Sequence, residues 1–129
     1  MLVWASCRID GDGRMQKELR LTRREDFNKV YRYGKSAANQ QYVVYCLPNP
    51  RIERFRMGIS VSKKLGGAVV RNRIRRVLKE IARLNEAKIR SHYDFVVIAR
   101  KPVTEMEYKE MEKSLMHVLK RAQLLRNPS

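Results

Sequence analysis

The residues best able to do chemistry on their own, two histidines and two cysteines, are scattered along the chain. His92 and His117 belong to no H-E-x-x-H pattern, and Cys7 and Cys46 form no C-x-x-C pair. A metal site needs several convergent ligands, so surface or capping roles are favoured for the histidines. The nucleophile motif G-x-S-x-G is absent. A Ser-His-Asp arrangement assembled from distant segments stays open, because sequence spacing does not test it. We therefore predict no catalytic residue and no metal ligand.

The acidic residues have structural explanations of their own. Glu25 and Glu107 stand three positions after Thr22 and Thr104, which is the spacing of a capping box at a helix start. Further glutamates crowd the start of the second of these helices, where negative charge is favoured. Paired catalytic carboxylates are not indicated.

A glycine-containing stretch, residues 62–67, does not match the phosphate-loop pattern G-x-x-x-x-G-K-[ST]. Nucleotide hydrolysis is therefore not predicted. A helix that starts after flexible glycines and lysines can instead hold a backbone phosphate of a nucleic acid.

Cationic side chains dominate the segment that includes and follows this stretch. Residues 63–83 contain eight Lys or Arg residues and a single acid, Glu80. A solvated face is the ordinary explanation of a charged helix, but this density without compensating acids favours polyanion binding. The eight cations are Lys63, Lys64, Arg71, Arg73, Arg75, Arg76, Lys79 and Arg83.

Four aromatic residues, Phe27, Tyr31, Tyr42 and Tyr45, fall on a predicted helix and the strand after it. Bases of single-stranded RNA stack on such rings. Core packing is the alternative for each ring, and the two interpretations are equally favoured. Strand alternation places Tyr45 on the same face as Val43 and Leu47.

Composition agrees with a nucleic-acid partner. The 129 residues carry a formal charge of +16, so RNA, DNA or an anionic membrane surface must be considered as partners. The hydrophobic fraction of 43% is sufficient for a core, which excludes disorder of the whole chain, and the length suits one domain.

Cysteine usage and hydropathy favour a reducing cytoplasm. Cys7 and Cys46 fit unpaired thiols better than a disulfide, because disulfide scaffolds have several paired cysteines. No apolar run reaches the ~20 residues of a membrane span, and the first residues lack the basic start of a signal peptide.

Residues 1–14 contain two Asp and two Arg, so their net charge is zero and the whole positive charge lies on residues 15–129. We interpret residues 1–14 as an extension, either disordered or not native, and residues 15–129 as a single RNA-binding domain. Met15 is then a candidate for the natural start.

The periodicity of residues 22–99 predicts two helices and three strands. A helix runs from Thr22 to Tyr33, with Gly34 in the left-handed position that stops helices. Strands at 41–47 and 54–61 form an antiparallel hairpin because they are close in sequence. The longest helix spans 70–90, and an apolar strand at 93–99 is covered on both faces or central in its sheet.

A last helix starts at the second capping box and frays near residues 127–128. The order α-β-β-α-β-α describes a small α+β fold, a two-layer sandwich with one sheet of three or four strands and helices packed on it.

Five sequence blocks in this order resemble the protein component of bacterial ribonuclease P. The central block is Val70-Arg71-Asn72-Arg73-Ile74-Arg75-Arg76, preceded by the strand and lysines of residues 58–64. The other blocks are residues 24–31, 34–36, 41–45 and 98–102, and together the resemblance covers Leu19 to about Leu125.

The resemblance implies a ribonucleoprotein endonuclease, a hydrolase that removes the 5′ leader of precursor tRNA and yields the mature tRNA 5′ end. Its RNA subunit holds most of the Mg²⁺ and performs the hydrolysis, and the protein is a non-catalytic subunit that broadens substrate specificity. The partners implied are ribonuclease P RNA and precursor tRNA, with no membrane and no small-molecule substrate. The family fold also implies a left-handed β-α-β crossover, as in domain 2 of ribosomal protein S5, where the general rule predicts a right-handed one.

Two groups of site residues follow from the resemblance. One would bind the catalytic RNA through its phosphates, and the other would line a cleft that grips the leader. The first group is Lys63, Lys64, Arg71, Asn72, Arg73, Arg75, Arg76 and Lys79, and the second is Phe27, Tyr31, Tyr45 and Ser60. The competing classes are another RNA-binding protein, such as a ribosomal one, a membrane-active cationic protein, and a metal-dependent nuclease that acts without RNA.

Overall fold

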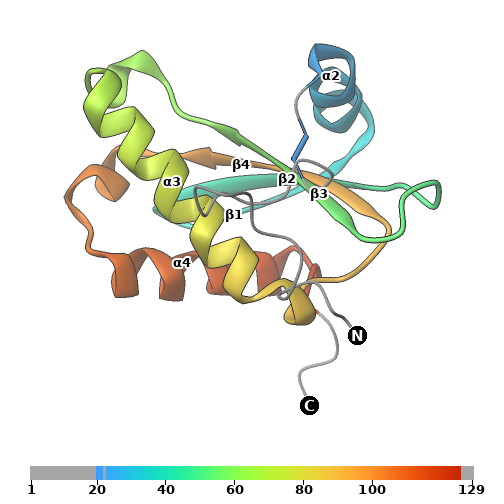
Figure 1. The fold of residues 1–129 in the computed structure, drawn as a ribbon. Helices are drawn as coiled ribbons and strands as arrows, with labels where there is room; N and C mark the ends of the chain where they lie inside the picture. Colours follow the sequence, from blue (N-terminus) through green and yellow to red (C-terminus); the bar gives the residue numbers. More distant parts are fainter. Residues whose placement is uncertain (1–19, 22, 126–129) are drawn as a thin grey trace, which may run out of the picture.

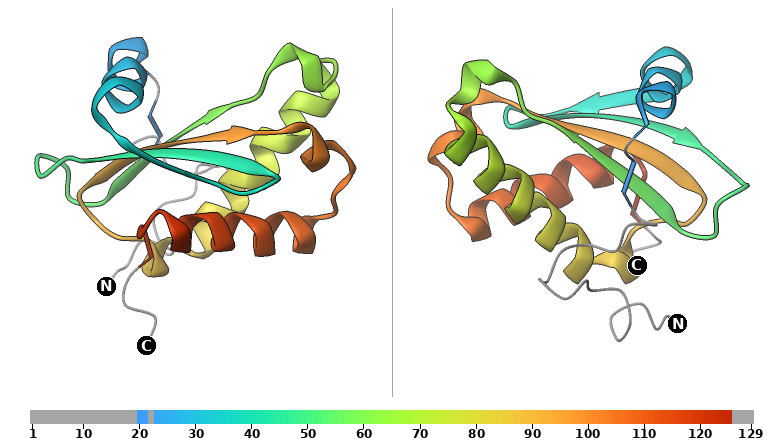
Figure 2. Two further views of the ribbon diagram at one scale, coloured as in Figure 1. Left: turned by 180° about the vertical axis from the view of Figure 1, so that it is seen from behind. Right: turned by 45° about the horizontal axis from the view of Figure 1, so that its top comes forward.

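The computed structural model describes residues 20, 21 and 23–125 (Figure 1). Within these residues four strands form one sheet in the order β1-β2-β4-β3. Helices α3 and α4 cover one face of the sheet, and α2 lies on the opposite face (Figures 1 and 2). The elements are α2 (Arg24–Tyr33), β1 (Lys35–Ala38), β2 (Tyr42–Pro48), β3 (Phe55–Ser60), α3 (Ala68–Leu84), β4 (Tyr93–Ala99) and α4 (Tyr108–Arg121). The predicted α+β sandwich is confirmed.

The prediction that strands 41–47 and 54–61, which correspond to β2 and β3, form an antiparallel hairpin is wrong. β4 lies between them, pairing antiparallel with β2 and parallel with β3. The apolar run of β4 explains this arrangement, because Phe95, Val96 and Val97 are all fully buried and only an interior strand hides both faces. The parallel pair β3 and β4 is connected through α3, as the resemblance implied.

Strand β1 was not predicted. Its residues, Lys-Ser-Ala-Ala, are mostly exposed and lack β-branched side chains, so no hydrophobic alternation marks them. They become a strand because they pair antiparallel with β2 from Lys35 opposite Cys46 to Ala38 opposite Val43.

Gly34 ends α2, but not in the left-handed conformation that was predicted. Its φ of −81° and ψ of 166° are extended, because the chain passes directly from α2 into β1. A glycine is required here for space. A Cβ at this position would lie 2.5 Å from the carbonyl oxygen of Val30 and 2.6 Å from that of Cys46.

Replacing Gly34 by alanine is therefore expected to lower the free energy of unfolding by about 1–3 kcal/mol, since two backbone segments must move apart. Urea denaturation measures this change. Gly67→Ala is the matched control, because a Cβ there meets nothing within 4 Å, and it should give a smaller loss. Equal stability of Gly34→Ala and the wild type would contradict the close approach.

Several predicted helix boundaries are wrong. Helix α2 begins after Arg23, which makes no side-chain cap, and Thr22 lies outside the described residues. The second capping box is formed by Glu107 and Glu110 rather than by Thr104 and Glu107. The Thr104 hydroxyl instead donates to the carbonyl of Lys101 within a short 3₁₀ turn.

Helix α3 ends at Leu84 rather than at Arg90. The side-chain amide of Asn85 donates to the carbonyl of Ile81 and to the carboxylate of Glu112, so it caps the helix and ties it to α4. A second 3₁₀ turn, Glu86–Lys88, then leads to the buried Ile89.

Two predictions concern the ends of the chain. The fraying point predicted at residues 127–128 and the extension predicted for residues 1–14 lie outside the described residues.

The main core lies between the sheet and the α3–α4 layer. It contains alternate residues of β2 and β4 together with Ile74, Leu78 and Ile81 of α3 and Met111 and Leu115 of α4. A smaller cluster of Leu21, Val30 and Val96 anchors α2 to the other face. None of the helices in the described part of the chain is long and apolar enough to span a bilayer.

Candidate nucleic-acid interface

The face of the sheet that carries α2 presents three rows of side chains. Each row runs across β2, β4 and β3, and successive rows lie roughly 7 Å apart because every second residue of a strand points to the same face. The pairing register gives the rows as Val43–Ile98–Ser60, Tyr45–Val96–Gly58 and Leu47–Asp94–Arg56. Helix α2 is short and covers this face only in part (Figure 2).

Three aromatic rings meet on this face. The ring centroids of Phe27 and Tyr31 are 6.3 Å apart, and those of Tyr31 and Tyr45 are 5.2 Å apart in an edge-to-face arrangement. Gly58 makes room for the Phe27 ring, because a Cβ on Gly58 would lie 2.5 Å from its Cζ atom. Helix α2 and strand β2 thus bring together three of the predicted leader-binding residues.

Ser60 joins the same cluster. Burial raises the pKa of Tyr31, and a side-chain hydrogen bond with Ser60 lowers it in part. Tyr31 remains 37% exposed, while Phe27, Tyr45 and Ser60 are half-buried. Rings that are partly exposed can accept a base against their open faces. We call Phe27, Tyr31, Tyr45 and Ser60 the aromatic cluster.

Tyr42 is separate from this cluster and belongs to the core. Its side chain is fully buried on the face that packs against α4, and its hydroxyl donates to the carbonyl of Met111 at 3.3 Å. The sequence left core packing and base stacking equally favoured for each ring. The alternation of side chains along β2 decides between them, because Tyr42 and Tyr45 point to opposite faces of the sheet.

The predicted cationic residues follow the outer strand β3. Lys63 and Lys64 are exposed in a 3₁₀ turn, Lys63–Leu65, whose start is capped by the Ser62 hydroxyl. Gly66 has a φ of 149°, a conformation that favours glycine, and it redirects the chain into α3. We call the eight residues Lys63, Lys64, Arg71, Asn72, Arg73, Arg75, Arg76 and Lys79 the cationic surface.

The arginines of α3 differ in their contacts. Arg71 donates to the carbonyl of Gly66 at 3.2 Å, and Arg73 donates to the carbonyl of Met106 at 3.0 Å, so both also hold the protein together. Arg75 donates to the side chain of Asn72 at 3.1 Å, and Arg76 is exposed. Arg83, on the same predicted face, is paired with Glu80 and contributes less positive charge.

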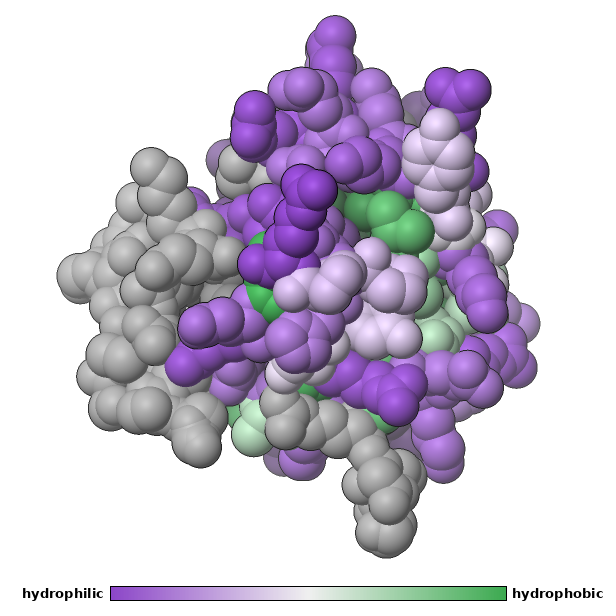
Figure 3. All heavy atoms as spheres, turned by 90° about the vertical axis from the view of Figure 1, so that its right-hand side faces the viewer, coloured by the Kyte–Doolittle hydropathy of each residue, from purple (hydrophilic) through white to green (hydrophobic). Residues whose placement is uncertain are grey.

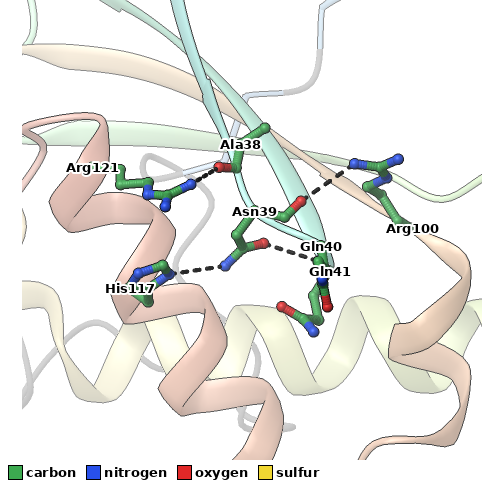
Figure 4. A pocket seen from close by; sticks show the side chains of 7 residues that line it. All are labelled: Ala38, Asn39, Gln40, Gln41, Arg100, His117 and Arg121. Carbon is green, nitrogen blue, oxygen red and sulfur yellow. Dashed lines mark hydrogen bonds between the residues drawn. The ribbon is translucent and has the colours of Figure 1, made fainter.

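A further cationic pocket at the β1–β2 turn was not predicted from the sequence (Figure 4). Its volume is about 470 Å³, and Arg100 and Arg121 reach the turn from different elements. Arg121 donates to the carbonyl of Ala38 at 2.7 Å and Arg100 to that of Asn39 at 3.3 Å. The two arginines lie far apart in the sequence, after β4 and at the end of α4, so only the fold reveals that they share a pocket.

The donor set offers little to a metal ion. No group of three or more His, Cys, Asp or Glu that could hold a metal occurs among the described residues. His92 contacts the carbonyl of Ile52 at 2.6 Å, and His117 lies 3.4 Å from the amide of Asn39. Cys46 is buried with a free thiol, and Cys7 lies outside the described residues.

The ion pairs on the α2 face were also not predicted from the sequence. Arg56 binds Asp94 through two hydrogen bonds of 2.8 Å, and its third nitrogen lies 3.5 Å from a carboxylate oxygen of Asp26. Asp94 also accepts from the amide of Asn49 at 3.0 Å. These residues come from two strands, one loop and one helix, so sequence spacing gives no signal for them.

Figure 3 shows this end of the molecule, with hydrophilic side chains over α2 and an apolar spot beneath it.

Comparisons with known proteins agree with this geometry. The family model described as Ribonuclease P matches residues 15–123. The ribonuclease P protein component of Listeria innocua is 46% identical over 87% of this chain and 94% of its own length, and that of Bacillus cereus is 48% identical over 87% and 97%. The solved ribonuclease P protein of Staphylococcus aureus superposes with a TM-score of 0.79 at 44% identity, covering 84% of this chain and 98% of that one.

The relatives match over most of each protein, and the family model spans both the aromatic cluster and the cationic surface. The chain therefore belongs to the ribonuclease P protein family, as a component of the endoribonuclease that processes tRNA.

Proposed function

We propose that this protein binds ribonuclease P RNA through its cationic surface and holds the 5′ leader of precursor tRNA on its aromatic cluster. In this proposal the RNA subunit cleaves the leader, and the protein contributes affinity and breadth of substrate rather than a catalytic residue.

The observation that carries the proposal is the meeting of Phe27, Tyr31, Tyr45 and Ser60 on one sheet face. The rings come from a helix and a strand and remain partly open, and the Tyr31 ring lies 6.3 Å from that of Phe27 and 5.2 Å from that of Tyr45. Every base has a π-face, so stacking tolerates any leader sequence. A subunit that serves many different precursors needs this tolerance.

The cationic surface supports a second and separate contact. It begins after β3 and continues along α3, on the layer opposite to α2 (Figure 2). Phosphates bind such cations without regard to sequence, and this fixes orientation rather than specificity. The two surfaces therefore allow one protein to hold catalytic RNA and leader at the same time.

Mg²⁺ enters the proposal as a component of the RNA subunit. Carboxylates are the protein groups that Mg²⁺ prefers. Among the described residues, the buried carboxylate of Asp94 is already bound by Arg56 and Asn49. When bound to the RNA subunit, Mg²⁺ would supply an activated water and stabilise the leaving oxygen.

Binding of precursor tRNA to the reconstituted holoenzyme tests the proposal. Precursors with a long leader, a short leader and no leader are compared, each with RNA alone and with RNA plus protein. The protein is expected to tighten binding of leader-bearing precursors selectively. An equal gain for the leaderless precursor would contradict leader binding.

A further inference from the structure

A second pocket adjoins the aromatic cluster on the α2 face. Its volume is about 330 Å³, and its lining includes Asp26 and Lys29 of α2, Leu47 of β2, and Arg56 of β3. Leu47, Phe27 and Tyr45 all pack against the smaller core cluster of this face, so the pocket lies next to the aromatic cluster. The row Leu47–Asp94–Arg56 lies directly beside the row that contains Tyr45.

We propose that this pocket receives one nucleotide of the leader and that the carboxylate of Asp26 reads its base edge. The inference rests on the proposed function, because it assigns a specific contact to a leader that the neighbouring rings hold without regard to sequence.

The Arg56 guanidinium is fixed in place beside Asp26. Two of its nitrogens bind the buried Asp94 at 2.8 Å, so the side chain cannot turn away. Its third nitrogen meets Asp26 only at 3.5 Å, at the limit of a hydrogen bond. A fixed donor and a weakly engaged carboxylate therefore lie side by side at the wall of the pocket.

Two further cations can hold the phosphate of the same nucleotide. Lys29 and Arg51 line the pocket, are exposed, and form no ion pair with any described residue. A phosphate between them would leave the base directed at Asp26 and Arg56. Phosphate contacts position the chain, and contacts to base edges specify sequence.

A carboxylate selects among bases by their donors. Adenine, cytosine and guanine present an exocyclic amino group, which donates to a carboxylate. Uracil has a single ring N–H between two carbonyl oxygens, and these oxygens repel the negative charge. The pocket is therefore expected to disfavour uracil at one leader position.

Asp26→Asn tests this assignment in the reconstituted holoenzyme, because it keeps the shape and removes the charge. A pool of precursors with every base at each leader position is cleaved, and relative kcat/KM values are compared. Wild-type enzyme should discriminate against uracil by about fivefold at one position, the lower end expected for a good base contact. Asp26→Asn should reduce that ratio to below about twofold and leave the other positions unchanged.

Glu25→Gln is the matched control. It removes a carboxylate from the same first turn of α2, but Glu25 is exposed and pairs only with the exposed Arg23 among the described residues. Its base profile should equal that of the wild type. An identical profile for Asp26→Asn and the wild type, or an equal change for all four bases, would overturn the pocket assignment.

Failure of the inference and failure of the proposed function give different results. If the proposed function is wrong, wild-type cleavage is independent of the leader at every position and length. If only the inference is wrong, cleavage still depends on the leader and on the aromatic cluster, but no uracil effect depends on Asp26.

Discussion

Replacing Phe27 or Tyr31 by alanine is expected to weaken binding of a leader-bearing precursor to the holoenzyme by about 1–3 kcal/mol for each lost stacking contact. The reason is the geometry of the aromatic cluster, where both rings are partly exposed and the Tyr31 ring contacts those of Phe27 and Tyr45. Equilibrium binding of labelled precursor tRNA to the reconstituted holoenzyme measures the loss.

Two controls separate lost stacking from damage to the fold. Tyr31→Phe keeps the ring and removes the hydrogen bond with Ser60, so it should bind nearly as well as the wild type. A precursor without a leader should bind Phe27→Ala and wild-type holoenzymes equally. If the loss persists without a leader, the substitution has disturbed the packing of α2 on the sheet and the leader role is wrong.

Removing four cations from the cationic surface should produce the other large effect. The variant Lys63→Ala, Lys64→Ala, Arg75→Ala and Arg76→Ala is expected to weaken assembly with ribonuclease P RNA. The slope of log affinity against log salt should decrease by about three, since each lost phosphate contact changes it by about 0.7–0.9. Binding titrations over a range of salt concentrations measure the slope.

A control with equal loss of charge distinguishes contacts from general attraction. Lys88, Lys109, Lys113 and Lys120 are exposed and lie outside the cationic surface. Replacing these four by alanine should leave the salt slope near the wild-type value. Equal slopes for the two variants would contradict docking through α3 and the turn before it.

Arg71 and Arg73 were left out of this variant because each bonds a backbone carbonyl of the protein itself. Loss of the Arg73 bond to Met106 would loosen α3 from the segment before α4. Urea denaturation of Arg73→Ala should therefore show a loss of about 0.5–1.5 kcal/mol, in addition to any effect on RNA binding.

The elements with strong periodicity were predictable from the sequence. Strand β4 was predicted with its observed bounds, because a run of large apolar residues can be satisfied only inside a sheet. The buried side of α3, with Ile74, Leu78 and Ile81, was likewise predicted from helical spacing.

Features that depend on tertiary contacts were not predictable in this way. Strand β1 exists because β2 offers it a partner, and the extended conformation of Gly34 exists because β1 follows directly. The false hairpin came from assuming that strands near in sequence pair, whereas β4 inserts between them.

The residues of the site differ in the same way in how far the sequence predicted them. The cationic surface is continuous in the sequence and its charge density was visible there. The aromatic cluster joins α2 to β2, and the resemblance rather than the spacing brought Ser60 into it. The pocket of Asp26, Arg56 and Asp94 has no sequence signal, because its residues meet only through the register of three strands and the placement of α2.

The most direct test of the account is cleavage of a 5′-labelled precursor tRNA at low Mg²⁺ by three preparations. These are the protein alone, bacterial ribonuclease P RNA alone, and the two together. The account predicts that only the mixture cleaves efficiently at the mature 5′ end. Cleavage by the protein alone, or a mixture no more active than the RNA alone, would contradict it.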